Sequence, residues 1–128
     1  MNLLLDTHTF IWWIADSPKL SSVARELIGN GGNRLYWSAA STWEASIKYV
    51  LGRLVLSEPP AKFFPEQLKI NRVESLPITD AHAIEAATLP PHHSDPFDRM
   101  LISQARIEGL ALVSIDPDMR KYGVDVLW

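Results

Sequence analysis

Short apolar runs alternate along this chain with longer segments whose apolar residues recur at helical spacing. The apolar runs predict buried strands over residues 2–5, 34–38, 72–78, 110–115 and 124–127. The helical spacing, punctuated by Gly and Pro, predicts helices over residues 7–15, 21–28, 40–51, 61–70, 79–88 and 96–108. Such alternation is typical of an α/β domain with a mostly parallel sheet. We therefore expect one domain over residues 1–128, with a twisted sheet of four to five short strands flanked by helices.

Composition places the chain among ordinary globular proteins. Its 128 residues are 47% hydrophobic and 21% charged, which is enough for one sizeable core. The longest apolar run, residues 10–15, is far shorter than a bilayer span, so we expect no membrane association. The absence of cysteine excludes disulfides, thiolate catalysis and Cys-bound zinc. The first residues have no basic region and no cleavage site, which favours a cytoplasmic location.

Four acidic residues stand where expected strands end or expected helices begin. Each has an ordinary structural explanation: Asp6 as a helix cap and Asp116 as a turn residue before a proline. Glu44 has the spacing of a capping box that begins three residues earlier. Asp98 follows Asp95 by three, as acids of a first helical turn do. Taken one at a time, an ordinary structural role is the simpler explanation for each acid.

The α/β topology nevertheless gives these acids a common place. Asp6 and Asp116 follow strands, so they lie at the carboxyl edge of a parallel sheet. Glu44 and Asp98 stand near the starts of helices, and a helix that runs antiparallel to the next strand begins at that same edge. Open α/β sheets place their functional sites there. Capping alone does not predict this convergence, so we treat the four acids as a candidate site.

Clustered carboxylates repel one another, and either protons or a cation must relieve the repulsion. A ligand set made only of oxygen suits a hard cation, Mg²⁺ or Mn²⁺ ahead of Zn²⁺, whose bound water can attack phosphorus. The net charge of −3, from 12 basic and 15 acidic residues, at first disfavours a nucleic-acid partner. Without the four acids the count is 12 basic against 11 acidic, so the excess acid is a concentrated metal pocket on a balanced surface.

Four stretches of the sequence resemble the PIN-domain ribonucleases, and specifically their VapC-like toxin branch. The most specific pair is the Asp-Pro-Phe-Asp-Arg motif at residues 95–99 with Trp43-Glu44 upstream. The order and spacing fit over nearly the whole chain, in the stretches Leu3 to His8, Ser38 to Lys48, His93 to Ala105 and Leu112 to Asp116. The resemblance implies a PIN-like fold over residues 1–128.

The same resemblance implies roles for individual residues. The positions that match the family's catalytic and metal-binding acids are Asp6, Glu44, Asp98 and Asp116. Residues expected to lie beside these ligands and support them are Thr7, Ser114 and Asp95, while Asp118 would replace or support Asp116. The family's activity is endonucleolytic cleavage of RNA with Mg²⁺ or Mn²⁺. Its usual assembly is a homodimer, held inactive by a cognate antitoxin whose tail enters the acidic groove.

Other residues have weaker assignments. Near the acidic edge, basic side chains would either grip RNA phosphates or neutralise the carboxylates: Lys48, Arg53 and Arg99. The histidines could ligate metal, but we favour solvent-exposed or supporting positions for His8, His82, His92 and His93. Among five tryptophans, Trp13, Trp37 and Trp43 are expected in the core, and at least one of Trp12 or Trp128 at an interface.

Two other functions compete with the ribonuclease. A strand that ends in Asp6 also suits a phosphohydrolase with an aspartyl-phosphate intermediate. That pattern normally has a second Asp two residues later, where this chain has His8. A regulatory or binding module that keeps the fold without catalysis is the other alternative, although all four acidic positions are filled.

Overall fold

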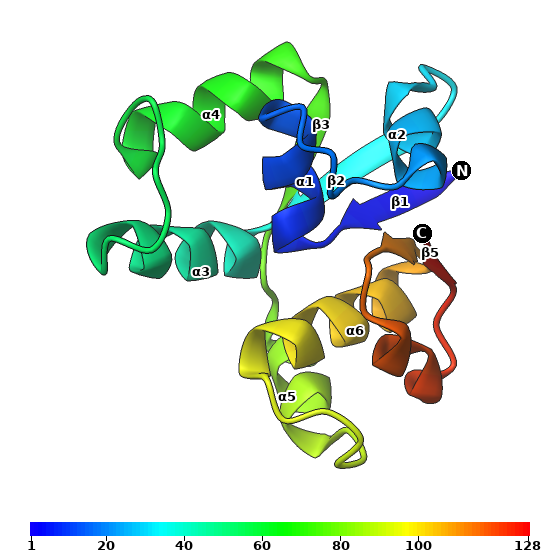
Figure 1. The fold of residues 1–128 in the computed structure, drawn as a ribbon. Helices are drawn as coiled ribbons and strands as arrows, with labels where there is room; N and C mark the ends of the chain where they lie inside the picture. Colours follow the sequence, from blue (N-terminus) through cyan, green and yellow to red (C-terminus); the bar gives the residue numbers. More distant parts are fainter.

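The computed structural model describes residues 1–128 and contains a five-stranded sheet with helices on both faces (Figure 1). Every strand pair is parallel, and the spatial order is β3-β2-β1-β4-β5. The strands are β1 (Asn2–Leu5), β2 (Arg34–Ser38), β3 (Val73–Leu76), β4 (Ala111–Val113) and β5 (Val126–Leu127). The α/β class and the strand number expected from the sequence are thus confirmed, and the sheet is parallel throughout.

Six α-helices and one 3₁₀ helix connect the strands. They are α1 (Thr7–Ile14), α2 (Ser22–Gly29), α3 (Ala39–Val50), α4 (Pro60–Ile70), α5 (Asp80–Thr88), α6 (Pro96–Glu108) and the 3₁₀ helix η1 (Pro117–Tyr122). Figure 1 shows α1, α2 and α4 on one side of the sheet, with α5, α6 and η1 on the other. None of these helices has the length and hydrophobicity required to cross a bilayer.

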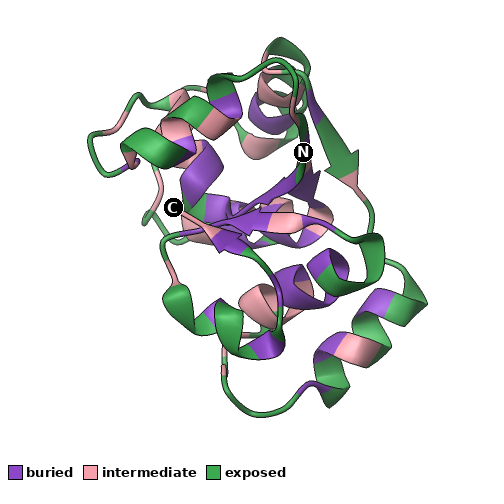
Figure 2. Cartoon of the chain, turned by 90° about the vertical axis from the view of Figure 1, so that its right-hand side faces the viewer, coloured by how far each residue is buried: buried purple, intermediate pink, exposed green.

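The central strand β1 separates two hydrophobic cores. Leu3, Leu4 and Leu5 are fully buried, and because side chains alternate along a strand they serve opposite faces. Leu3 and Leu5 pack with residues of α1, α2 and α4, whereas Leu4 packs with residues of α6 and η1. Figure 2 shows buried residues along the strands and on the helix faces turned toward them. A strand buried on both faces explains why residues 2–5 are uninterrupted leucine after Asn2.

The helix starts explain two differences from the predicted elements. The Ser38 side chain accepts from the Ala40 N–H and caps α3, so the helix begins at Ala39. The capping box that the spacing of Glu44 offered as its structural explanation does not form, because Glu44 and Ser41, three residues earlier, both lie inside the helix. The expected strands 72–78 and 110–115 are shorter in the structure, and η1 follows the latter. Pro117 at the first position of η1 favours a helical turn over continued strand.

Candidate active site

Asp6 occupies the end of the central strand, at the carboxyl edge of the sheet. It caps α1 with one carboxylate oxygen, 2.6 Å from the Thr7 N–H, and its other oxygen accepts from Ser114 Oγ at 2.6 Å. Burial raises the pKa of Asp6 above its ordinary value although both hydrogen bonds act to lower it, and the nearby charge of Glu44 raises it further. Asp6 is therefore both a helix cap and a buried carboxyl held close to other acids.

Asp98 faces the same place from the first turn of α6. The Asp95 side chain caps this helix by accepting from the N–H groups of Phe97 and Asp98, and Pro96 occupies the first helical position. Burial raises the pKa of Asp98 to about 7, with the charges of Asp6 and Asp95 adding to the effect. Carboxyl groups whose pKa is raised this far are common in functional sites.

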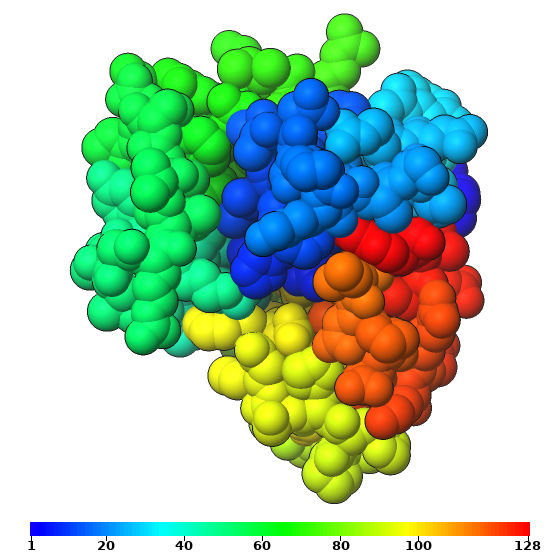
Figure 3. All heavy atoms as spheres, viewed as in Figure 1, coloured from blue at the N-terminus to red at the C-terminus, as the bar shows by residue number.

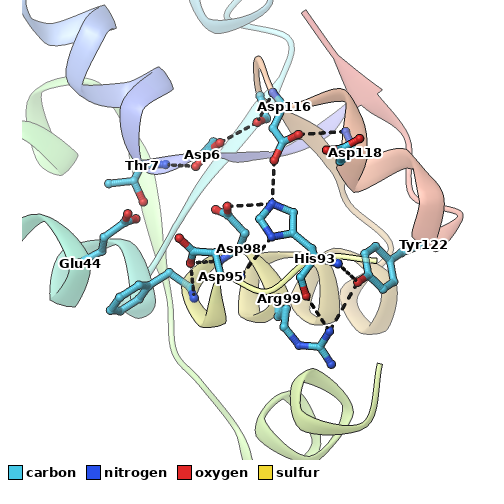
Figure 4. Close-up of polar contacts among 12 residues, drawn as sticks. Asp6, Thr7, Glu44, His93, Asp95, Asp98, Arg99, Asp116, Asp118 and Tyr122 are labelled. Atoms are coloured by element: carbon cyan, nitrogen blue, oxygen red, sulfur yellow. Dashed lines mark hydrogen bonds and ion pairs between the residues drawn. The ribbon is translucent and has the colours of Figure 1, made fainter. Parts of the chain in front are cut away.

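His93 joins Asp98 and Asp116 at the centre of the cluster. Its Nε2 atom lies 3.2 Å from an Asp98 oxygen and 2.8 Å from an Asp116 oxygen. The Asp95 N–H donates to His93 Nδ1 at 3.2 Å, which fixes the ring with Nε2 toward the acids. Partial burial lowers the pKa of His93, but the hydrogen bond to Asp116 and the nearby acidic charges outweigh it and raise the pKa. Figure 4 shows the ring between the two carboxylates.

Glu44 completes the set of four acids from the opposite side. It lies on α3, and its carboxylate is 3.0 Å from Lys48 Nζ, one helical turn along. Its charge raises the pKa of both Asp6 and Asp98, so it belongs to the same electrostatic cluster. In Figure 4, Glu44 points from α3 toward the region that Asp98 reaches from α6. The structure therefore brings together all four acids that the sequence singled out.

The residues expected to support the acids, Thr7, Ser114 and Asp118, differ in what their side chains contact. Ser114 links two acids, because its hydroxyl donates to Asp6 and accepts from the Asp116 N–H at 3.1 Å. Thr7 is buried beside Asp6, but its hydroxyl donates to Ser41 Oγ at 2.7 Å. Asp118 supports Asp116 through its backbone N–H at 2.9 Å, while its own carboxylate pairs with Lys121 at 3.3 Å. Asp118 therefore does not replace Asp116 in this arrangement.

The donor set fits a divalent cation. Ligand atoms of His93, Asp98 and Asp116 all lie within 4.8 Å of one another, a span that one ion can bridge with modest side-chain adjustment. Repulsion between the acids also raises the pKa of Asp98, and a bound cation would relieve it. These three side chains come from the α5–α6 loop, the first turn of α6 and the segment after β4, so the fold itself assembles the donors.

The PIN domain family model matches residues 3–125 of this chain. The chain belongs to the PIN-domain family. Its sequence is similar to Ribonuclease VapC22 of Mycobacterium tuberculosis (strain ATCC 25618 / H37Rv), with 30% identity over 121 residues, 94% of this chain and 91% of that protein. Ribonuclease VapC16 of the same organism is 33% identical over 69 residues, which are 51% of this chain and 49% of VapC16.

Solved structures show the same fold at low sequence identity. VapBC2 from Rickettsia felis, bound to a DNA fragment from its promoter, aligns with a TM-score of 0.70 and 16% identity over 98% of this PIN domain and 97% of that chain. FitAcB from Neisseria gonorrhoeae aligns with a TM-score of 0.63 and 17% identity, covering 97% of this chain and 95% of the other. VapBC-1 from nontypeable Haemophilus influenzae gives 0.63 and 17%, with coverage of 98% and 96%.

Arg99 of the PIN domain does not project into the acidic cluster. Its guanidinium donates to the backbone oxygens of Ala86, Leu89, Pro90 and His93, at 2.7 to 3.1 Å. The expectation that Arg99 grips RNA phosphates or neutralises the acids is wrong for this arrangement, because carbonyl groups occupy its donors. Arg99 instead fastens the loop that carries His93 (Figure 4).

The other two basic candidates differ from each other. Lys48 lies at the site, where it pairs with Glu44 and lies 3.2 Å from His8 Nε2. Arg53 is exposed just beyond α3 and forms no ion pair. Lys48 thus has the neutralising role that we considered, and its contact with RNA remains a prediction, as does that of Arg53.

The expected burial of two residues, His82 and Trp43, is wrong. His82 is neither exposed nor beside the acids: its ring is buried, with Nδ1 accepting from the Thr79 N–H and Nε2 2.8 Å from Glu108. It completes a capping box for α5, a use of histidine that spacing alone does not reveal. Trp43 is 63% exposed, whereas Trp37 is fully buried as expected and Trp13 packs against the core. His8 and His92 are exposed, as predicted.

Proposed function

We propose that this protein is a Mg²⁺- or Mn²⁺-dependent endoribonuclease, the toxin of a toxin–antitoxin pair. The observation that carries the proposal is the meeting of Asp6, Glu44, Asp98 and Asp116 at the carboxyl edge of the sheet, with the pKa of Asp98 raised to about 7. The likeness to Ribonuclease VapC22 over 94% of the chain supports RNA as the substrate.

The residues divide the work by position. The carboxylates of Asp6, Asp98 and Asp116, with Glu44, would hold the cation, and His93 lies close enough to Asp98 and Asp116 to share it or to support them. A bound Mg²⁺ or Mn²⁺ would supply charge for the scissile phosphate and lower the pKa of a water molecule. Ser114 holds Asp6 and the Asp116 backbone in place, and the capped start of α6 presents Asp98.

Replacing Asp6 or Asp98 by Asn tests the site directly. Each variant is expected to lose RNA cleavage and to relieve growth arrest on expression, because an amide is a weaker metal ligand than a carboxylate. Asp118→Asn is the matched control, since its carboxylate faces Lys121. Calorimetry with Mn²⁺ would separate metal affinity from catalysis. Cleavage that persists in both Asn variants without metal would refute the mechanism.

A cognate antitoxin is the partner that we propose, supported by the likeness to the VapBC structures. A second copy of the chain is the other proposed partner. Helix α3 and its C-cap residue Leu51 expose an apolar row at helical spacing: Trp43 at 63%, Ile47 at 38%, Val50 at 81% and Leu51 at 59% exposure. Of these, Trp43 also packs edge-on against Phe97. Exposed rows of this kind mark protein contacts. Light scattering of Val50→Glu is expected to show a monomer where the parent chain is a dimer, and an unchanged mass would exclude this face.

The two alternative functions are an aspartate-based phosphohydrolase and a binding module without catalysis. An aspartyl-phosphate mechanism of this kind normally has a second Asp two residues after the nucleophile, and this chain has His8 at that position. We therefore disfavour the phosphohydrolase, and trapping of a phosphoaspartate at Asp6 would reinstate it. A binding module without catalysis would show neither Mn²⁺ affinity nor RNA cleavage.

A further inference from the structure

An aromatic row extends from the acidic cluster across the surface of α1. His8, which is exposed, follows Asp6 by two residues, and its ring centroid is 5.8 Å from that of Trp12 one turn along. Trp12 in turn packs edge-on against Trp128, with ring centroids 5.9 Å apart. Figure 3 shows α1 at the front of this face, where it meets the start of α6, η1 and the C-terminal end of the chain.

The two tryptophans of this row, Trp12 and Trp128, differ from those of the core in the hydrogen bonding of the indole N–H. The indole N–H groups of Trp13 and Trp37 donate to protein oxygens, at 3.0 and 2.7 Å. Trp12 and Trp128 are only partly buried and donate to no protein acceptor. The only buried side-chain polar atom without a partner in the chain is Gln104 Oε1, so both of these N–H groups reach solvent. Trp12 and Trp128 therefore pack inward while they keep a polar edge at the surface.

Cationic groups lie beside the same rings. Lys48 Nζ is 3.2 Å from His8 Nε2 and also pairs with Glu44, which joins the row to the acidic cluster. Lys19 Nζ lies 6.0 Å from the centre of the Trp12 ring. Aromatic rings interleaved with cations are the combination that binds single-stranded nucleic acid, because bases stack on rings while cations contact phosphates.

We propose that His8 and Trp12, bordered by Lys48 and Lys19, form a stacking platform for the bases of single-stranded RNA next to the scissile phosphate. The inference rests on the ribonuclease function proposed above and names the surface that positions the substrate. Single-stranded RNA fits better than a duplex, because the bases of a duplex are already stacked and paired. A protein ligand on this row is the competing occupant, and the test below separates the two.

The test compares binding of a fluorescein-labelled 12-nucleotide oligoadenylate with that of an abasic oligonucleotide of the same length. Fluorescence anisotropy is measured with Mn²⁺ present, and a gel checks that the strand stays intact. The parent protein is expected to bind the oligoadenylate at least about fivefold more tightly than the abasic strand, the lower end for one stacked base. His8→Ala and Trp12→Leu are expected to lose that preference and keep their affinity for the abasic strand.

The matched control is Trp43→Leu, a more exposed tryptophan on α3 that lies outside this aromatic row and whose replacement keeps the α3 surface apolar. It is expected to keep the preference for bases. The His8 side chain is exposed, so His8→Ala should leave the fold intact. Its result can therefore be interpreted even if Trp12→Leu destabilises the fold. An equal preference in the parent protein and both row variants would overturn the inference, as would loss of antitoxin binding by these variants with unchanged RNA binding. Failure of the ribonuclease proposal is seen separately, as absence of cleavage in the parent protein.

Discussion

The ionisation of Asp98 opposes folding of the metal-free protein. Its pKa of about 7 in the folded state compares with 3.8 in the unfolded chain. Because the raised pKa means that the folded state holds this proton more tightly, the stabilisation is complete below pH 4 and is lost as the pH rises to 7. We therefore predict that Asp98→Asn, which removes the charge, makes the metal-free protein more stable at pH 8.

The size of the effect follows from the shift. A difference of about three pKa units corresponds to about 4 kcal/mol at high pH. The side chain keeps 20% of its exposure, so solvent screens part of the repulsion and we expect a gain of about 2–3 kcal/mol in the free energy of unfolding. The first turn of α6 tolerates the change, because the Asp95 side chain and not Asp98 caps the helix.

The assay is urea denaturation in EDTA at pH 4 and pH 8, followed by circular dichroism. At pH 8 the midpoint of Asp98→Asn is expected above that of the parent protein, while at pH 4 the two should nearly coincide because the Asp98 carboxyl is protonated in the folded parent protein. Asp118→Asn serves as the control, with its carboxylate 58% exposed and paired with Lys121. An Asp98→Asn variant that is no more stable than the parent protein at pH 8 would refute the reasoning. Added Mn²⁺ should stabilise the parent protein and not the variant.

Three further predictions concern the scaffold. Arg99→Gln removes donors from four carbonyl groups and should lower the free energy of unfolding, measured by urea denaturation, by about 2–3 kcal/mol. Arg53→Gln is the control and should cause no measurable loss. Equal losses in the two variants would contradict the role of Arg99 in holding the loop. Leu4→Ala empties a fully buried position and should lower the unfolding free energy by about 3 kcal/mol, and a loss below about 1 would contradict the packing. Gly109→Ala places a side chain at φ +67 and should lower thermal stability by about 1 kcal/mol, with an unchanged melting temperature as the opposing result.

The sequence was sufficient to predict which acids meet and at which edge. That prediction needed only the order of strands and helices, because parallel topology brings the ends of β1 and β4 and the starts of α3 and α6 to one side. The boundaries of α6 followed from Pro96 at its start and Gly109 at its end, because the backbone preferences of proline and glycine act locally.

Contacts set by loops could not be predicted in the same way. The position of His93 depends on the Asp95 N–H and on the four carbonyl groups that Arg99 gathers, and no periodic pattern encodes these. The exposure of Trp43 was missed because its spacing along α3 matches that of a core residue, and nothing in the pattern tells an inward apolar row from an exposed one. The spacing also did not show that Ser38, rather than Ser41 with Glu44, caps α3.

The pairing of β1 with β4 also has a consequence for synthesis of the protein on the ribosome. Leu3 pairs with Ala111, and Ser114 holds the carboxylate of Asp6, so the first strand finds one of its two neighbours only after residue 111 has been synthesised. Contacts of such long sequence separation form late. A nascent chain that lacks residues 111–116 therefore has Asp6 without Ser114 and Asp116, and we expect the acidic cluster to assemble only after these residues have been synthesised.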